Sequence, residues 1–133
     1  CLNISKINAK MLNVDKRIKF YKSDVDKFVL GKYDLIVSNP PYIKKYKIKY
    51  LERDVAEFEP TLALNGGLDG LSEIRKVISK SSELIKKNGK FILEIGFNQK
   101  NKIISLLKEK GFYINSVSKD LSKNDRCIVC TKI

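Results

Sequence analysis

The sequence lacks several of the residues on which common kinds of site depend. It contains no histidine and an odd number of cysteines, three, which argues against Cys/His catalysis and against a disulfide framework. No apolar run approaches the roughly 18 residues that a membrane span needs, since even the stretch at 91–97 is interrupted by Glu94. The first residues also lack the charged start and apolar block of a secretory signal. These absences predict a cytoplasmic protein without membrane contact.

The length of 133 residues suits one domain, and 43% hydrophobic residues are enough for a core without disulfides or metal. The formal net charge is +12, supplied mainly by lysines spread along the whole chain. Such a charge is typical either of a nucleic-acid partner or of a solvated surface, and the even spread favours the surface. One local concentration interleaves basic and aromatic residues and is a candidate for holding substrate: Tyr42, Lys44, Lys45, Tyr46, Lys47, Lys49 and Tyr50.

Cys127 and Cys130 have the spacing of a redox or metal motif. They lie in an apolar run that is typical of a buried strand, however, and residues three apart on a strand face opposite sides of the sheet. We therefore expect the two sulfur atoms to diverge and predict no metal site.

Strand-like and helical patterns alternate along the chain, which indicates an α/β fold with an open sheet. The apolar centre of the second strand is typical of a parallel strand covered on both faces, and the last two strands should form an antiparallel pair. Between Asn39 and about Gly70 the pattern stops, and a long irregular stretch of that kind is usually functional. The expected strands are 18–23, 33–38, 91–95, 112–118 and 126–132; the expected helices end near Asn13, at Asn88-Gly89 and at Gly111.

The most informative segment is Asn39-Pro-Pro-Tyr42, which follows the second strand. Ligands bind at the carboxyl ends of strands in open α/β sheets, and Pro40 and Pro41 remove backbone donors so that carbonyls in the turn stay free. The amide oxygen of Asn39 and the carbonyl of Pro40 would each accept one N–H of a planar amino group, with Tyr42 on its flat face. Such a set orients a nitrogen lone pair toward an electrophile. The alternative is a simple turn in which the two prolines only stop the strand.

This segment resembles the substrate motif of class I S-adenosylmethionine methyltransferases that act on planar nitrogens, either adenine N6 or glutamine. Two further blocks, at 58–71 and 93–99, narrow the resemblance to the bacterial release-factor glutamine N5-methyltransferases. The 120–126 stretch and the Ser23-Asp24 pair also fit that family. The resemblance covers nearly the whole chain, and it implies a Rossmann-like fold with a mostly parallel sheet and a final antiparallel strand pair.

The resemblance also implies roles for individual residues. Asn39, Pro40, Pro41 and Tyr42 would be the catalytic set, and Asp24, Val25 and Asn39 would bind the cofactor, S-adenosylmethionine. Val25 stands where the family often has an aromatic residue beside the adenine, and Asp24 is equally well explained as a solvated loop carboxylate. The family's first strand, glycine-rich loop and second strand would lie upstream of Cys1, so we expect residues 1–133 to be a partial catalytic domain, inactive alone.

The resemblance implies, for the intact enzyme, methylation of a glutamine side-chain nitrogen in a peptide-chain release factor. One alternative is an adenine N6 methyltransferase on DNA or RNA, favoured by the +12 charge but not by the 58–71 block. Another is an inactive, truncated remnant. Within the 58–71 block, the glycines around Asp69 would shape the substrate entrance or merely cap the next helix, and Glu57 and Glu59 are weaker candidates for substrate contact.

Overall fold

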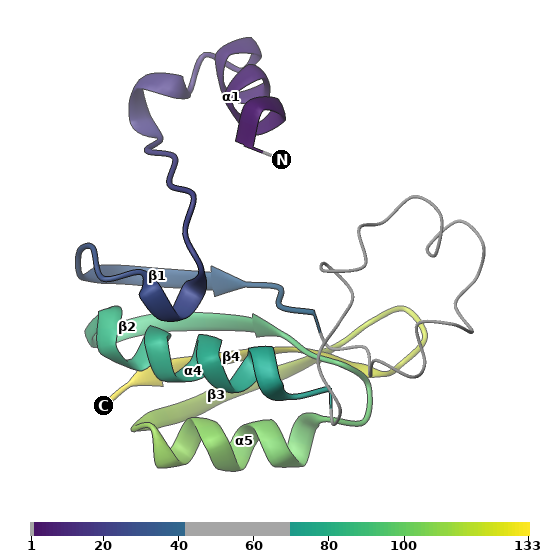
Figure 1. The fold of residues 1–133 in the computed structure, drawn as a ribbon. Helices are drawn as coiled ribbons and strands as arrows, with labels where there is room; N and C mark the ends of the chain where they lie inside the picture. Colours follow the sequence, from purple (N-terminus) through teal and green to yellow (C-terminus); the bar gives the residue numbers. More distant parts are fainter. Residues whose placement is uncertain (1, 42–69) are drawn as a thin grey trace.

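The computed structural model describes residues 2–41 and 70–133 of the chain (Figure 1). None of the helices in these two ranges is both long and apolar enough to cross a membrane. The elements in chain order are helix α1 (Leu2–Met11), the 3-10 turns η1 (Asp15–Arg17) and η2 (Val25–Lys27), strand β1 (Tyr33–Ser38), helix α4 (Ser72–Leu84), strand β2 (Ile85–Glu94), helix α5 (Lys100–Glu109), and strands β3 (Phe112–Lys119) and β4 (Asp125–Lys132).

The strands form one mixed sheet in the order β1-β2-β4-β3. β1 and β2 are parallel, with Ser38 opposite Leu93, whereas β4 runs antiparallel to both β2 and β3. The predicted antiparallel pair at the end of the chain is therefore confirmed, and β4 also inserts between β2 and β3. Because β1 and β2 run in the same direction, their carboxyl ends lie together at the same end of the sheet.

Helices α4 and α5 pack on one face of this sheet and form the core with it (Figure 1). The centre of that core is fully buried and includes Phe91 and Phe112, whose rings lie 5.6 Å apart. The opposite face is open among the described residues, and Leu35 and Val37 of β1 are 53% and 65% exposed. The expectation that β1 is covered on both faces is thus not met here, because the described helices all lie on the other side.

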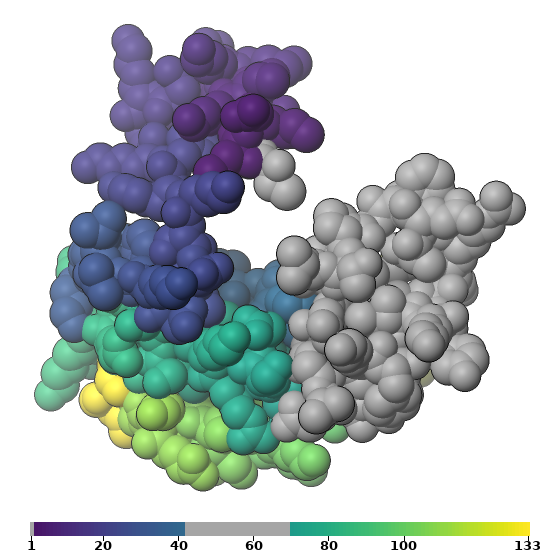
Figure 2. All heavy atoms as spheres, viewed as in Figure 1, coloured from purple at the N-terminus to yellow at the C-terminus, as the bar shows by residue number. Residues whose placement is uncertain are grey.

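The expected first strand is absent, since residues 18–23 pair with no described strand. A strand needs a neighbour with which to exchange backbone hydrogen bonds, and none of the described strands lies beside this segment. Tyr21 instead packs edge-on against Phe28, with ring centres 5.7 Å apart. In Figures 1 and 2, α1 and the turn after it stand away from the sheet.

Asn88 and Gly89 do not end a helix as expected. α4 ends at Leu84, four residues earlier, and Asn88 lies within β2 with a φ of 65°. Asn88 therefore adopts the predicted left-handed conformation, but at an irregularity in the β1–β2 pairing. A Cβ atom at Gly89 would lie 2.7 Å from Ile85 and 2.9 Å from the Lys86 carbonyl oxygen, so this close approach requires glycine.

The remaining elements follow the sequence pattern. α5 ends at Glu109, two residues before the predicted stop at Gly111, and Gly111 has a φ of 75°. Cys127 and Cys130 are both free and lie on β4, where Cys127 is half-buried and Cys130 is buried. Their spacing of three places them on opposite faces, as predicted.

Candidate active site

The Asn-Pro-Pro segment leaves the sheet at the carboxyl end of β1. Asn39 is exposed, Pro40 is buried and Pro41 is half-buried, so a polar side chain stands on an anchored turn. The pairing of Ser38 with Leu93 places this turn alongside the residues that follow β2. Tyr42 lies outside the described residues, as do the lysine and tyrosine cluster at 42–50 and the glutamates and glycines at 57–69.

An open groove of about 490 Å³ runs along β1. Its walls come from the segment before β1, from β1 itself and from α4, and they include Val25, Leu35, Val37, Ser38, Lys80 and Ser81. Val25 is half-buried and packs against the core. Asp24 does not line the groove, and its exposed carboxylate lies 3.4 Å from the Lys27 ammonium.

The residues present fit only part of S-adenosylmethionine. The groove is mainly apolar, so it suits a flat base resting against Val25. Among the described residues, its lining contains neither a glycine nor a carboxylate, the groups that hold the polar parts of a nucleotide cofactor in open α/β folds. The structure thus brings Val25 near the β1 end that carries Asn39, while Asp24 stands outside.

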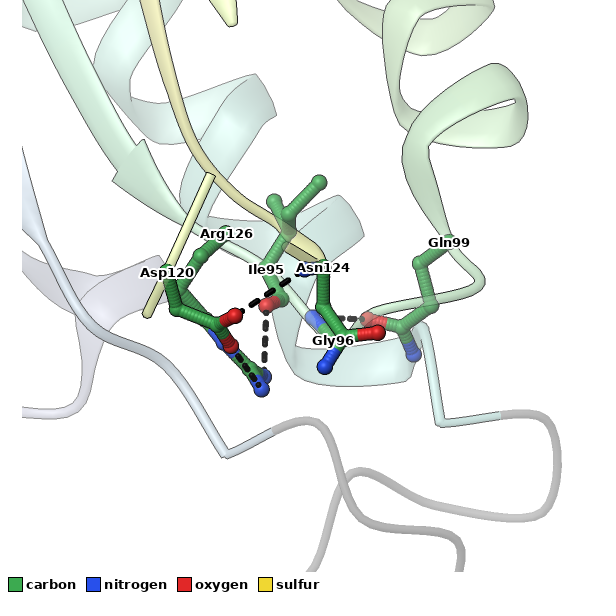
Figure 3. Close-up of polar contacts among 6 residues, drawn as sticks. All are labelled: Ile95, Gly96, Gln99, Asp120, Asn124 and Arg126. Carbon is green, nitrogen blue, oxygen red and sulfur yellow. Dashed lines mark hydrogen bonds and ion pairs between the residues drawn. The ribbon is translucent and has the colours of Figure 1, made fainter. Parts of the chain in front are cut away.

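The loop after β2 is fixed by a buried side chain, Gln99, which is 7% exposed (Figure 3). Its Oε1 atom accepts the Gly96 N–H at 2.9 Å, and its Nε2 atom donates to the Gly70 carbonyl at 2.9 Å. One amide thereby joins the loop after β2 to the residue that precedes Leu71 and α4. This loop lies at the same end of the sheet as Asn39.

A second contact holds the end of β2 from the β4 side. The Ile95 N–H donates to the Arg126 carbonyl at 2.9 Å, and the Arg126 Nη1 atom donates to the Ile95 carbonyl at 3.3 Å (Figure 3). Asp120 positions the guanidinium, since its Oδ2 atom accepts from Arg126 Nε at 3.1 Å and Nη2 at 3.0 Å. The Asn124 N–H donates to Asp120 Oδ1 at 2.9 Å. The Asn124 N–H and the Arg126 guanidinium hold the pKa of Asp120 below its usual range.

Sequence reasoning assigned no role to Gln99 or Arg126, although both fall in blocks noted above. One signal was available: arginine is rare in this lysine-rich chain, and a guanidinium makes a fixed fork of bonds that an ammonium cannot make. The carbonyls of Gly70 and Ile95, which these side chains bind, could not have been inferred, because they lie 29 and 31 residues away in the sequence.

Curated relatives match this chain from end to end. A release factor glutamine methyltransferase of Clostridium acetobutylicum is 35% identical over 134 residues, which cover 98% of this chain and 47% of the relative. Another, of Clostridium botulinum, is 39% identical over 133 residues, with the same two shares. Over nearly its whole length, this chain is thus similar to release factor glutamine methyltransferases. It spans less than half the length of these relatives. A further methyltransferase family, described as RMKL-like, methyltransferase domain, matches residues 1–55.

Solved structures of other proteins share the fold. TrmN of Thermus thermophilus superposes with a TM-score of 0.62 at 16% identity, over 99% of this chain and 33% of that one. The N-methyltransferase NodS of Bradyrhizobium japonicum, in complex with S-adenosyl-L-homocysteine, gives 0.50 at 14% identity, over 92% and 59%. At such identities only the fold is shown, and it confirms the predicted Rossmann-like α/β class.

Proposed function

We propose that the complete gene product transfers a methyl group from S-adenosylmethionine to the side-chain amide nitrogen of a glutamine in a peptide-chain release factor. The observation that carries the proposal is the position of Asn39 and Pro40. In a chain similar to this family, they emerge at the carboxyl end of β1, beside the end of β2. Ligands bind at the carboxyl ends of the strands in open α/β sheets.

In this proposal the chain's own groups orient the acceptor. The exposed Asn39 amide oxygen accepts one N–H of the substrate amide, and the Pro40 carbonyl accepts the other. Burial of Pro40 fixes the turn, so the two acceptors keep a constant separation. Tyr42 would form the wall of the pocket. Alignment of this kind accounts for much of the acceleration, and neither a nucleophilic side chain nor a strong base is required.

When bound, S-adenosylmethionine supplies the electrophilic methyl carbon. Val25 would offer its apolar surface to the adenine, and Asn39 would border both cofactor and acceptor. Asp24 would accept a hydrogen bond from the adenine amino group, and it would have to leave Lys27 to do so. The bound S-adenosyl-L-homocysteine of the NodS structure supports a cofactor of this class. With a release factor as substrate, the protein would act in translation termination in the cytoplasm.

The test is to supply the complete gene product with labelled S-adenosylmethionine and one acceptor at a time. A release factor should take up label, and its variant with the acceptor glutamine replaced by alanine should not. Transfer RNA, ribosomal RNA and duplex DNA should remain unlabelled. Label found mainly in nucleic acid would overturn the proposal.

That outcome would support a second candidate, an adenine N6 methyltransferase. The +12 formal charge favours it, and a planar exocyclic amino group fits the same pair of acceptors. Salt separates the two candidates further. Nucleic-acid binding weakens steeply as ionic strength rises because counterions compete for the phosphates, whereas binding of a protein acceptor should depend on salt much less.

A further inference from the structure

The end of β2 is held by a set of hydrogen bonds from the β4 side. Both backbone groups of Ile95 are paired with Arg126: its N–H bonds to the Arg126 carbonyl, and its carbonyl to the guanidinium. The Asp120 carboxylate and the Asn124 N–H in turn fix the guanidinium. The side chains of Arg126 and Asp120 are only 29% and 25% exposed, so solvent competes weakly for these bonds.

The β1–β2 register relates these contacts of Arg126 to the candidate active site. Ser38 is level with Leu93, the last pair of the ladder. The same register, continued by two residues beyond it, would bring Pro40 level with Ile95. Both of these residues are buried. Proline has no N–H with which to continue the ladder, so the strand pairing that fixes Ser38 cannot fix Pro40 in the same way. The position of Pro40 then depends on how well the neighbouring strand end is held.

We propose that Arg126 is a positioning residue for Asn39 and Pro40. Held by Asp120, it fixes the end of β2 through Ile95, and it does not touch the substrate. The proposal rests on the proposed function in one respect, namely that Asn39 and Pro40 hold the acceptor nitrogen. A shift of about 1 Å in such a pair can reduce the rate about a hundredfold, so even a small displacement of the strand end matters.

Three variants of the complete gene product test this. Arg126→Met keeps the aliphatic stem and removes the fork, while Arg126→Lys keeps the charge and one donor direction. Lys100→Met is the matched control, because it removes a neighbouring ion pair, Lys100 to Asp125 at 3.2 Å, that does not involve Ile95. We expect kcat to fall about 10- to 100-fold in Arg126→Met and less in Arg126→Lys, with KM for S-adenosylmethionine within about twofold. Lys100→Met should stay within about twofold of the wild type.

Amide hydrogen exchange provides a readout that needs no activity. In Arg126→Met, peptides that cover 34–39 and 92–96 should exchange faster, and peptides from β3 should not. A rise that is equal over β1, β2 and β3 would show a general loss of stability and would overturn the proposal. An unchanged kcat in Arg126→Met, with normal exchange at 34–39, would overturn it as well.

The two proposals can fail separately. If the wild type methylates a nucleobase, the proposed function is wrong, and the Arg126 variants are then measured with that acceptor. If the wild type methylates glutamine and Arg126→Met retains full kcat, only the positioning role is wrong. If the wild type methylates neither, the exchange pattern alone decides.

Discussion

The two described ranges, 2–41 and 70–133, differ in how far their apolar side chains are buried. From Leu71 onward, large apolar side chains fill the core. The eleven largest fully buried side chains among the described residues all lie in this range. In residues 2–41, Ala9 is the one hydrophobic residue that is buried, while most large apolar side chains are exposed. Composition does not explain this contrast, since both ranges are rich in isoleucine and leucine. Burial is decided by neighbours. α4, α5 and β4 cover mainly residues of their own range, and from residues 2–41 Val25 and Ile36 pack against that core.

The contrast should be clearest in stability. Phe91→Ala removes a fully buried ring that packs on Phe112 and should lower the free energy of unfolding by about 3–5 kcal/mol. Leu35→Ala, on the open face of β1, should cost less than about 1 kcal/mol. Urea unfolding of the chain followed by circular dichroism measures both. Equal losses would mean that the open face of β1 is covered in solution.

Asn39 lies where the two ranges meet, and its replacement should affect chemistry rather than folding. In the complete gene product, Asn39→Ala should reduce methyl transfer at least about a hundredfold and leave cofactor affinity within several-fold, because the amide orients the acceptor. Initial rates and calorimetric titration provide the two values, and Tyr42→Ala should have a smaller effect. Near-normal turnover of Asn39→Ala would remove it from the site.

The open groove beside β1 should bind S-adenosylmethionine only weakly when residues 1–133 are tested alone. We expect residues 1–133 not to bind S-adenosylmethionine at micromolar concentration and not to catalyse transfer. The part of the lining that the structure describes offers apolar contact but neither a glycine turn nor a carboxylate for the cofactor's polar groups. Isothermal titration is the measurement. Saturable micromolar binding would show that other residues of the chain hold the cofactor.

The two cysteines of β4 provide a chemical probe of the packed range. Burial raises the pKa of Cys130 to about 12, and its thiol donates to the Phe91 carbonyl at 3.4 Å. Because this pKa lies above the unfolded value, the thiol favours folding at neutral pH, and that contribution is lost as pH rises from about 9 toward 12. Iodoacetamide at pH 8 should modify Cys127 at least about tenfold faster than Cys130. Comparable rates, read by peptide mass spectrometry, would contradict this burial.

The smallest effect concerns the outer edge of β1, the first strand in the sheet order. An exposed strand edge with apolar side chains promotes association between copies. Val37→Lys should therefore reduce concentration-dependent self-association in sedimentation velocity, with the free energy of unfolding unchanged within about 0.5 kcal/mol. Self-association that is the same in the variant would place the contact elsewhere.

Local signals predicted much of the fold. β1 has its predicted bounds because an apolar run meets the Asn-Pro-Pro turn, and Gly111 marks the end of α5 through its positive φ. Besides the expected covering of β1 on both faces, two predictions were wrong for physical reasons. The 18–23 run has strand composition but no neighbour to pair with, and Asn88 has a turn conformation that fits a strand irregularity as well as a helix end.

The candidate site was predicted only in part. Asn39 and Pro40 could be found because their chemistry and their position after a strand are local features. Gln99 and Arg126 could not be assigned, because their distant partners Gly70 and Ile95 come into reach only when the chain has folded. The assigned roles of all six site residues stay predictions: Asp24, Val25, Asn39, Pro40, Pro41 and Tyr42.

The placement of β4 has a consequence for the order of folding. β2 and β3 are separated in the sheet by a strand that follows both of them in the sequence. During synthesis, the ribosome delivers β1, α4, β2, α5 and β3 before the strand that joins them, so Phe91 and Phe112 cannot be locked in register until the residues up to Lys132 have emerged. Arg126 arrives with that same strand. The nascent chain should thus complete its sheet and form the Arg126–Ile95 contacts beside its candidate active site in one late, cooperative step.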